Sequence, residues 1–158
     1  GDGDRAWEVF DIINPIRRAS TPEAAATYLR EPYVLPGDVS GGAHAGKGGW
    51  SWYTGAAGWT WQLAVHGILG IEVMSDAIRI SPCLPRDWAR AEIRLVGPLG
   101  EVLISIEDPD RIGKGRTEIT VDGAPAQGDT VRFPGEGKSR KARVLVVRPA
   151  QGHRDQAE

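Results

Sequence analysis

Residues 55–80 read GAAGWTWQLAVHGILGIEVMSDAIRI, and the hydrophobic pattern of the chain changes within this stretch. Up to Ile68 the apolar residues recur at helical spacing and cover most of the circumference, which predicts a buried helix. After Gly70 apolar and polar residues alternate, as at Ile78 and Ile80, which predicts half-buried strands. We therefore expect a chain that is helical first and β afterwards, with a boundary near Gly70.

Two shorter helices are expected upstream of this stretch. Apolar residues at three- and four-residue spacing predict a helix over about 5–14, which Pro15 ends. Ser20 and Glu23 have the spacing of a capping box, so a second helix is expected to follow them. Three helices cannot enclose an apolar core alone, and we expect residues 1–69 to be the C-terminal part of a larger helical domain.

Strands are expected throughout the second half of the chain. Turn signals separate them at short intervals, at Ser75-Asp76, Gly97-Pro98, Asp122-Gly123 and Pro134-Gly135. This pattern is typical of an antiparallel sandwich or barrel, and we expect a β-sandwich over residues 70–150. The polar residues 151–158 show no periodicity and are expected to form a disordered tail. The predicted fold class is therefore α+β.

The composition limits the classes of function open to the chain. Its 158 residues carry a net charge of -2, which argues against a nucleic-acid partner held by charge. A hydrophobic share of 41% is normal for a soluble globular chain, and no apolar run approaches the roughly 20 residues of a membrane helix. The single Cys83 excludes an internal disulfide and is expected to be a small buried residue. Without an initial Met or a signal peptide, the chain is expected to be part of a longer protein.

Thr54 and Gly55 lie where the aromatic stretch GGWSWYTGAAGWTW, residues 48–61, enters the expected helix. The Thr54 hydroxyl is suited to cap this helix, which would leave the N–H groups of the next residues free for an anion. Glycine at position 55 lets an oxyanion approach the backbone. Spacing alone favours the simpler interpretation, a threonine cap followed by a glycine that permits close packing.

Aromatic side chains beside this pair are candidates for sugar binding. The C–H faces of a sugar stack on indole rings, so Trp50 and Trp52 are expected to contact a substrate. Trp59 and Trp61 lie on the expected helix, and core packing is favoured for both of them.

Two histidines and one carboxylate complete the set of candidates. His44 lies beside Lys47 on a glycine-rich loop, where it can donate to phosphate or to a substrate sugar, although an exposed loop histidine is the simpler interpretation. His66 is expected to be a buried core residue whose ring nitrogens have hydrogen-bond partners. Asp38 is the only carboxylate of the loop, so it cannot form the acid and base pair that glycoside cleavage usually requires. The sequence contains neither a metal-ligand cluster nor a nucleotide-binding phosphate loop.

Four motifs occur together in a characteristic order along the chain. They are GDGDRAWEVFDIINP, EPYVLPGDV, HAGKGGWSWYTGAAGW and IRISPCLPRDW. In this order they resemble the C-terminal region of glycoside hydrolase family 94, formerly glycosyltransferase family 36. Within that family the chain looks most similar to the cyclic β-1,2-glucan synthases, with cellobiose and chitobiose phosphorylases as more distant relatives.

The resemblance implies a fold, a reaction and one site. The fold is an (α/α)6 barrel followed by a C-terminal β-sandwich. The reaction is inverting phosphorolysis of a β-glucosidic bond, here a β-1,2 bond, with release of α-glucose 1-phosphate. The family's phosphate-binding Thr-Gly pair matches Thr54-Gly55, so the resemblance favours the anion interpretation of this pair. The family's general acid, an aspartate, matches no residue of this chain, and the chain alone is expected to be inactive.

The expected ligands are a β-glucan oligosaccharide and inorganic phosphate as co-substrate, with no cofactor and no metal. The resemblance adds the remainder of a parent polypeptide as a partner, and the apolar helix faces leave a homo-oligomer open. Neither nucleic acid nor direct membrane contact is expected. We expect a soluble segment, with a cytoplasmic location preferred, and an inner-membrane association of the parent stays open. The alternative function is a non-catalytic carbohydrate-binding or structural β-sandwich module, and the structural role is favoured because Trp88 is the only tryptophan of that half.

Overall fold

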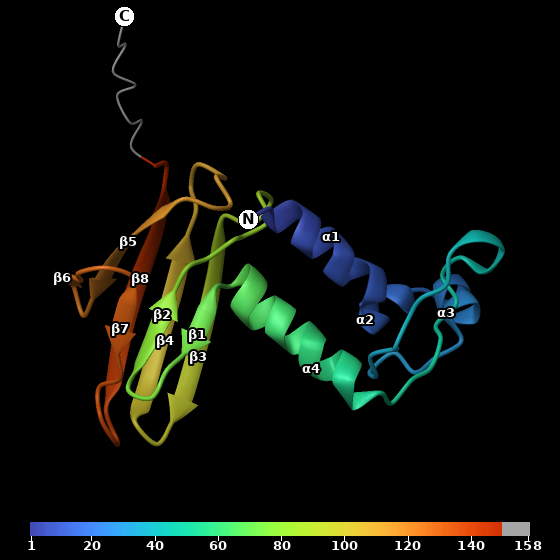
Figure 1. The fold of residues 1–158 in the computed structure, drawn as a ribbon, viewed down its shortest axis with the longest axis horizontal. Coiled ribbons are helices and arrows are strands. Elements are labelled where there is room, and N and C mark those ends of the chain that lie inside the picture. Colours follow the sequence, from blue (N-terminus) through green and yellow to red (C-terminus); the bar gives the residue numbers. More distant parts are fainter. Residues whose placement is uncertain (150–158) are drawn as a thin grey trace, which may run out of the picture.

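The helices of the chain come first and lead into two packed β-sheets (Figure 1), as seen in a computed structural model that describes residues 1–149. The helical elements are α1 (Gly3–Ile13), α2 (Pro15–Arg18), α3 (Pro22–Tyr28), the 3-10 helix η1 (Gly42–His44), α4 (Thr54–Gln62) and the π-helix η2 (Leu63–Ile68). The strands are β1 (Ile71–Val73), β2 (Ala77–Ile80), β3 (Arg90–Gly97), β4 (Gly100–Glu107), β5 (Arg116–Val121), β6 (Ala124–Pro125), β7 (Thr130–Arg132) and β8 (Ser139–Val147). The predicted α+β class is confirmed.

The strands form the two layers of a sandwich, as predicted. One sheet has three strands in the order β1-β2-β7, and the other has five in the order β3-β4-β8-β5-β6. Neighbouring strands run antiparallel in every pair of the described chain except β4 and β8, which run parallel with Val102 opposite Arg140. Parallel neighbours need a long connection, and here β5, β6 and β7 lie between the two strands in the sequence.

Side chains that alternate along the strands fill the space between the sheets. In β4, Val102, Ile104 and Ile106 face inwards and are at most 2% exposed. Val144 and Val146 of β8 face inwards in the same way. Together with inward residues of the other sheet they form one apolar cluster, which is the core that the alternating pattern predicted.

The helical part is attached to the sandwich at the start of α1. This helix runs away from the sheets, and α4 with η2 returns to them beside α1 (Figure 1). Gly3 packs so closely that a Cβ at this position would lie 2.1 Å from the carbonyl oxygen of Leu84. Arg86 donates its backbone N–H to the carboxylate of Asp4 over 2.7 Å and pairs with it through the guanidinium. Direct contacts therefore hold α1 against the segment that precedes β3.

The first helices begin at side chains other than those expected. Thr21, and not Ser20, caps α3, and its hydroxyl accepts a hydrogen bond from an N–H of the first turn over 3.2 Å. Pro22 accounts for this shift, because the residue before a proline is extended, as an N-cap residue is. Pro15 ends α1 as predicted, but the chain continues as helix because the side chain of Asn14 caps α2.

The prediction that residues 55–68 form a buried helix is wrong for α4. Trp59 and Trp61 are 74% and 58% exposed, and only Thr60 is buried. His66 of η2, expected in the core, is exposed as well, with its ring edge-on to Trp61. The physical reason is that α1 and β1 pack on η2, whereas no element within residues 1–149 covers α4 in the same way.

Three further expectations concern Cys83, the division of the chain near Gly70 and the C-terminal tail. Cys83 is buried and makes no disulfide, as predicted. The division of the chain at residues 69 and 70 stays a prediction, although η2 ends at Ile68 and β1 begins at Ile71. The expected tail at 151–158 lies outside the described residues.

Candidate functional site

The start of α4 differs from the predicted threonine cap. Thr54 is the first residue of the helix, and Tyr53 is the N-cap residue, whose carbonyl accepts from the N–H groups of Ala56 and Ala57 at 3.1 and 3.4 Å. The prediction that Thr54 caps the helix is therefore wrong, because a residue inside the first turn cannot also precede it. The Thr54 side chain is exposed and makes no capping hydrogen bond.

The N–H groups of Thr54 and Gly55 are donors that the helix itself cannot use. The described chain offers neither of them a backbone acceptor, and the first turn contains no acidic residue. A Cβ at position 55 would lie 3.1 to 3.3 Å from ring and hydroxyl atoms of Tyr53, so the glycine is packed under this ring. Free N–H groups at the positive end of a helix dipole favour a negative charge. The start of α4 can therefore bind an anion.

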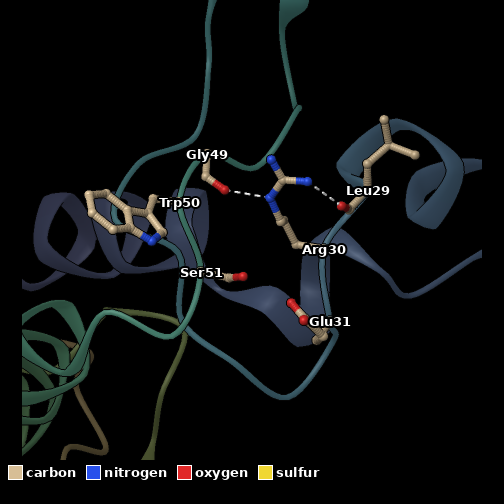
Figure 2. Close-up of a pocket in the computed structure, with 6 residues that line it drawn as sticks. All are labelled: Leu29, Arg30, Glu31, Gly49, Trp50 and Ser51. Atoms are coloured by element: carbon tan, nitrogen blue, oxygen red, sulfur yellow. Dashed lines mark hydrogen bonds between the residues drawn. The ribbon is translucent and has the colours of Figure 1, made fainter.

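Hydrogen bonds from residues 28–38 hold the segment that leads into α4. They run from the Gly48 N–H to the Tyr28 carbonyl (2.9 Å), from the Gly37 N–H to the Trp50 carbonyl (2.6 Å), and from the Arg30 guanidinium to the Gly49 carbonyl (Figure 2). Gly49 has no space for a side chain, since a Cβ there would lie 2.0 Å from a carboxylate oxygen of Asp38. The close pairing of these two segments explains why the aromatic stretch begins with glycines.

Trp52 connects this segment to α4 with an unusual backbone conformation. Its φ of 64° lies in the left-handed region, which bulky residues rarely adopt. The indole Nε1 donates to the Glu31 carboxylate at 3.1 Å, and the ring lies edge-on to Tyr33 with centroids 6.4 Å apart. The backbone N–H of Glu31 itself, followed by the Trp52 and Ser51 side chains, lowers the pKa of this carboxyl. Glu31 is therefore a charged acceptor at neutral pH.

The two tryptophans predicted to contact substrate both lie on the surface of the described chain. Trp50 is 81% exposed and Trp52 is 68% exposed. The left-handed residue interrupts the simple alternation of sides that an extended strand would impose. Their contact with a sugar stays a prediction.

His44 lies at the end of η1, on a loop closed at its base by a bridge between Val39 and Gly48. Its side chain is exposed, and no hydrogen bond within residues 1–149 joins it to the segment 50–55. In Figure 1 this loop projects beyond α3, apart from the start of α4. The structure does not bring His44 to Thr54, and a ligand role for His44 stays a prediction.

Residues 1–149 contain no group of three or more histidine, cysteine or acidic side chains placed to hold a metal ion. Asp38 is exposed, and its carboxylate lies against Gly49. Over the same residues, no helix has the length and apolar character needed to cross a membrane.

The sequence alone did not identify Glu31, Tyr33 or Arg30 as parts of this region. Glu31 and Tyr33 lie in the motif EPYVLPGDV, which supported the family resemblance but indicated no role for either residue. The hydrogen bond from Trp52 to Glu31 joins residues 21 apart in the sequence, and neither residue lies in a periodic element. No local pattern predicts a contact of this kind, so it became visible only in the folded chain.

The geometry of this region indicates a class of protein. A helix start with unused N–H groups next to exposed indole rings, on helices that precede a β-sandwich, is suited to a carbohydrate-active protein that handles phosphate. Residues 1–70 match the family model described as Glycosyl hydrolase 94 superfamily, catalytic domain. This part of the chain, which contains three of the four motifs, belongs to the glycosyl hydrolase 94 superfamily, and the resemblance of those motifs is confirmed.

Curated relatives extend the match into the β-sandwich. The chain is 43% identical over 105 residues to the cyclic beta-(1,2)-glucan synthase NdvB of Rhizobium meliloti (strain 1021), which covers 65% of this chain and 4% of that protein. It is 32% identical over 149 residues to N,N'-diacetylchitobiose phosphorylase of Vibrio proteolyticus, covering 93% of this chain and 18% of the relative. It is 30% identical over 146 residues to solabiose phosphorylase of Paenibacillus borealis, covering 91% of this chain and 19% of the relative. The chain thus spans less than a fifth of the length of these relatives.

Proposed function

We propose that this chain supplies the phosphate-binding edge of the active site of a β-glucan-processing glycoside phosphorylase or glucan synthase. Phosphate is the co-substrate, and the N–H groups of Thr54 and Gly55 bind it together with the Thr54 hydroxyl. The observation that carries the proposal is the start of α4, where these donors are unused by the helix. The names of the relatives, two phosphorylases and a glucan synthase, support the same chemistry.

In the proposed reaction, a phosphate oxygen attacks the anomeric carbon as the bond to the leaving sugar oxygen breaks. A general acid protonates that oxygen, and inversion gives α-glucose 1-phosphate. Backbone N–H groups suit the phosphate side of this step, because they stabilise a negative charge without taking or giving a proton. No residue of this chain is assigned as the general acid, so its proposed part is to bind and orient phosphate. A β-1,2 bond is the proposed linkage, supported by the glucan synthase named for it.

The β-sandwich has a structural role in this proposal. Trp88 lies edge-on to Trp7 of α1, with ring centroids 5.0 Å apart, so it packs where the helices contact the sandwich. A groove of about 730 Å³ crosses the outer face of the five-stranded sheet, and charged side chains such as Arg90 and Arg143 line it. None of its lining residues is aromatic. Because sugar-binding platforms use aromatic rings, this observation favours a structural module over a carbohydrate-binding one.

The test is the affinity of the full chain for inorganic phosphate after Thr54→Val, measured by ³¹P NMR titration. Valine keeps the shape of the side chain and removes the hydroxyl, so we expect binding to weaken about tenfold, the equivalent of one hydrogen bond. Thr117→Val, in β5, makes the same chemical change within the sandwich and should leave the affinity unchanged. Equal affinities for the Thr54 variant and the unaltered chain would remove Thr54 from the site.

A further inference from the structure

The start of α4 lies at the end of this helix that points away from the β-sheets (Figure 1). At the opposite end α1 and β1 pack on η2, which continues α4, whereas no element within residues 1–149 packs on α4 in the same way. The orientation of the Thr54 and Gly55 N–H groups therefore depends on residues 48–53, which connect the helix to the preceding loop.

Trp52 is the last residue of this connecting segment that a hydrogen bond joins to residues 28–38 in the described chain. Its indole Nε1 donates to Oε1 of Glu31 over 3.1 Å, and its ring lies edge-on to Tyr33. The backbone φ of 64° is one that bulky residues rarely adopt, so it persists only where surrounding contacts hold it. The backbone turn into α4 therefore depends on what the Trp52 side chain binds.

The Glu31 carboxylate is directed at the protein and not at solvent. Oε1 accepts from the indole, and Oε2 is buried, so a ligand cannot reach it. Figure 2 shows the carboxylate and the Ser51 side chain pointing toward one another from the two paired segments. A charged carboxylate is a stronger acceptor for the indole N–H than a neutral oxygen is. Glu31 is therefore placed to act on the chain itself.

We propose that Glu31 is a positioning residue of the phosphate site, which holds the backbone at Trp52 through the indole and so orients the N–H groups of Thr54 and Gly55 toward phosphate. The inference rests on the proposed function. Donors that are fixed before the ligand arrives bind it more tightly, because the apparent affinity falls with the fraction of molecules in the competent conformation. Glu31 makes no contact with the phosphate, which its negative charge would repel.

Glu31→Leu and Glu31→Gln test this role as a pair. Both remove the charge and keep a side chain of similar size, but only glutamine retains an oxygen that accepts from the indole. We expect Glu31→Leu to weaken phosphate binding by the full chain at least about fivefold, the equivalent of one hydrogen bond. Glu31→Gln should stay within about twofold of the unaltered chain, because the same hydrogen bond can form. Affinities are measured by ³¹P NMR titration, and Glu136→Leu, on an exposed turn, should leave the affinity unchanged.

The backbone conformation of Trp52 provides a second readout, which a general loss of stability would not reproduce. The N–H and Hα protons of a residue in the left-handed region lie closer together than in extended backbone, so the nuclear Overhauser effect between them is strong. We expect this strong signal at Trp52 in the unaltered chain and in Glu31→Gln, and a weaker one in Glu31→Leu. Circular dichroism shows that each variant is folded at the temperature of the measurement.

Four outcomes would overturn the positioning role. They are an unchanged phosphate affinity in Glu31→Leu, equal losses in Glu31→Leu and Glu31→Gln, an equal loss in the Glu136→Leu control, and an unchanged Trp52 signal in Glu31→Leu. Phosphate binding of equal strength in all variants would leave the proposed function in place and remove Glu31 from it. Absence of phosphate binding by the unaltered chain, with the expected pattern of Trp52 signals, would count against the phosphate site and retain Glu31 as the residue that orients the start of α4.

Discussion

Trp52 adopts a left-handed backbone conformation at the point where the extended aromatic segment turns into α4. Such a conformation costs about 1–3 kcal/mol in a residue with a side chain, so surrounding contacts must hold it. The carboxylate of Glu31 and the ring of Tyr33 provide those contacts. Trp52 lies two residues before Thr54, and its conformation therefore sets the direction in which the helix begins. A residue that could not adopt this conformation would move the N–H groups of Thr54 and Gly55, which we propose bind phosphate.

Asp4 gives a testable prediction for a single residue. The backbone N–H of Arg86, followed by its guanidinium, lowers the pKa of the Asp4 carboxyl in the folded chain. A lowered pKa contributes stability that is present above the ordinary value of 3.8 and is lost as the pH falls through the folded value. We expect Asp4→Asn to lower the melting temperature at pH 7. The difference from the unaltered chain should shrink as the pH falls below 3.8.

Thermal unfolding followed by circular dichroism between pH 3 and pH 7 measures this difference. Asp110→Asn is the matched control, because the Asp110 carboxylate makes no ion pair within the described part of the chain. If the difference in melting temperature between Asp4→Asn and the unaltered chain stayed constant over the whole pH range, the charge of Asp4 would not stabilise the contact between α1 and Arg86.

At the scale of elements, the sequence predicted where helices lie better than what covers them. The helical spacing of residues 55–68 predicted nearly the observed bounds, and α4 with η2 covers 54–68. Burial did not follow, because it depends on partner elements that local spacing does not specify. The change to π-helical geometry at Leu63 was also not predicted, and it brings Trp61 and His66, five residues apart, into contact.

Two glycine-to-alanine changes in helices are expected to have opposite effects on stability. In α1, Gly3→Ala would place a Cβ 2.1 Å from the Leu84 carbonyl oxygen, so the helix must shift away from the sandwich. We expect a loss of about 1–3 kcal/mol in the free energy of unfolding, as for overpacked sites. In α4, a Cβ at Gly58 would meet nothing within 4 Å, so Gly58→Ala should stabilise the helix by about 0.5–1 kcal/mol. Urea denaturation of both variants measures whether each change raises or lowers the free energy of unfolding. An unchanged free energy of unfolding for Gly3→Ala would contradict the close attachment of α1 to the sandwich.

At the scale of the whole molecule, the fold class followed from two periodicities that change near Gly70. The parallel pairing of β4 with β8 did not follow, because those strands are separated by three others in the sequence and no local signal specifies their neighbours. The same distinction between what the sequence indicates and what only the folded chain shows holds for the candidate site. Thr54 and Gly55 were chosen because the motifs of the chain resemble a family in which this pair binds phosphate, whereas their spacing alone favoured a simple threonine cap. Glu31 could not be recognised, since its contact with Trp52 depends on the pairing of two loops.

The central claim is that phosphate binds at the start of α4, and amide chemical shifts of the full chain test it most directly. Inorganic phosphate is titrated into the ¹⁵N-labelled chain, and the shift of every backbone N–H is followed. The account predicts the largest saturable changes at Thr54 and Gly55, because their N–H groups would donate to the phosphate oxygens. Saturable changes centred on another element, or none at Thr54 and Gly55 while phosphate binds, would contradict it.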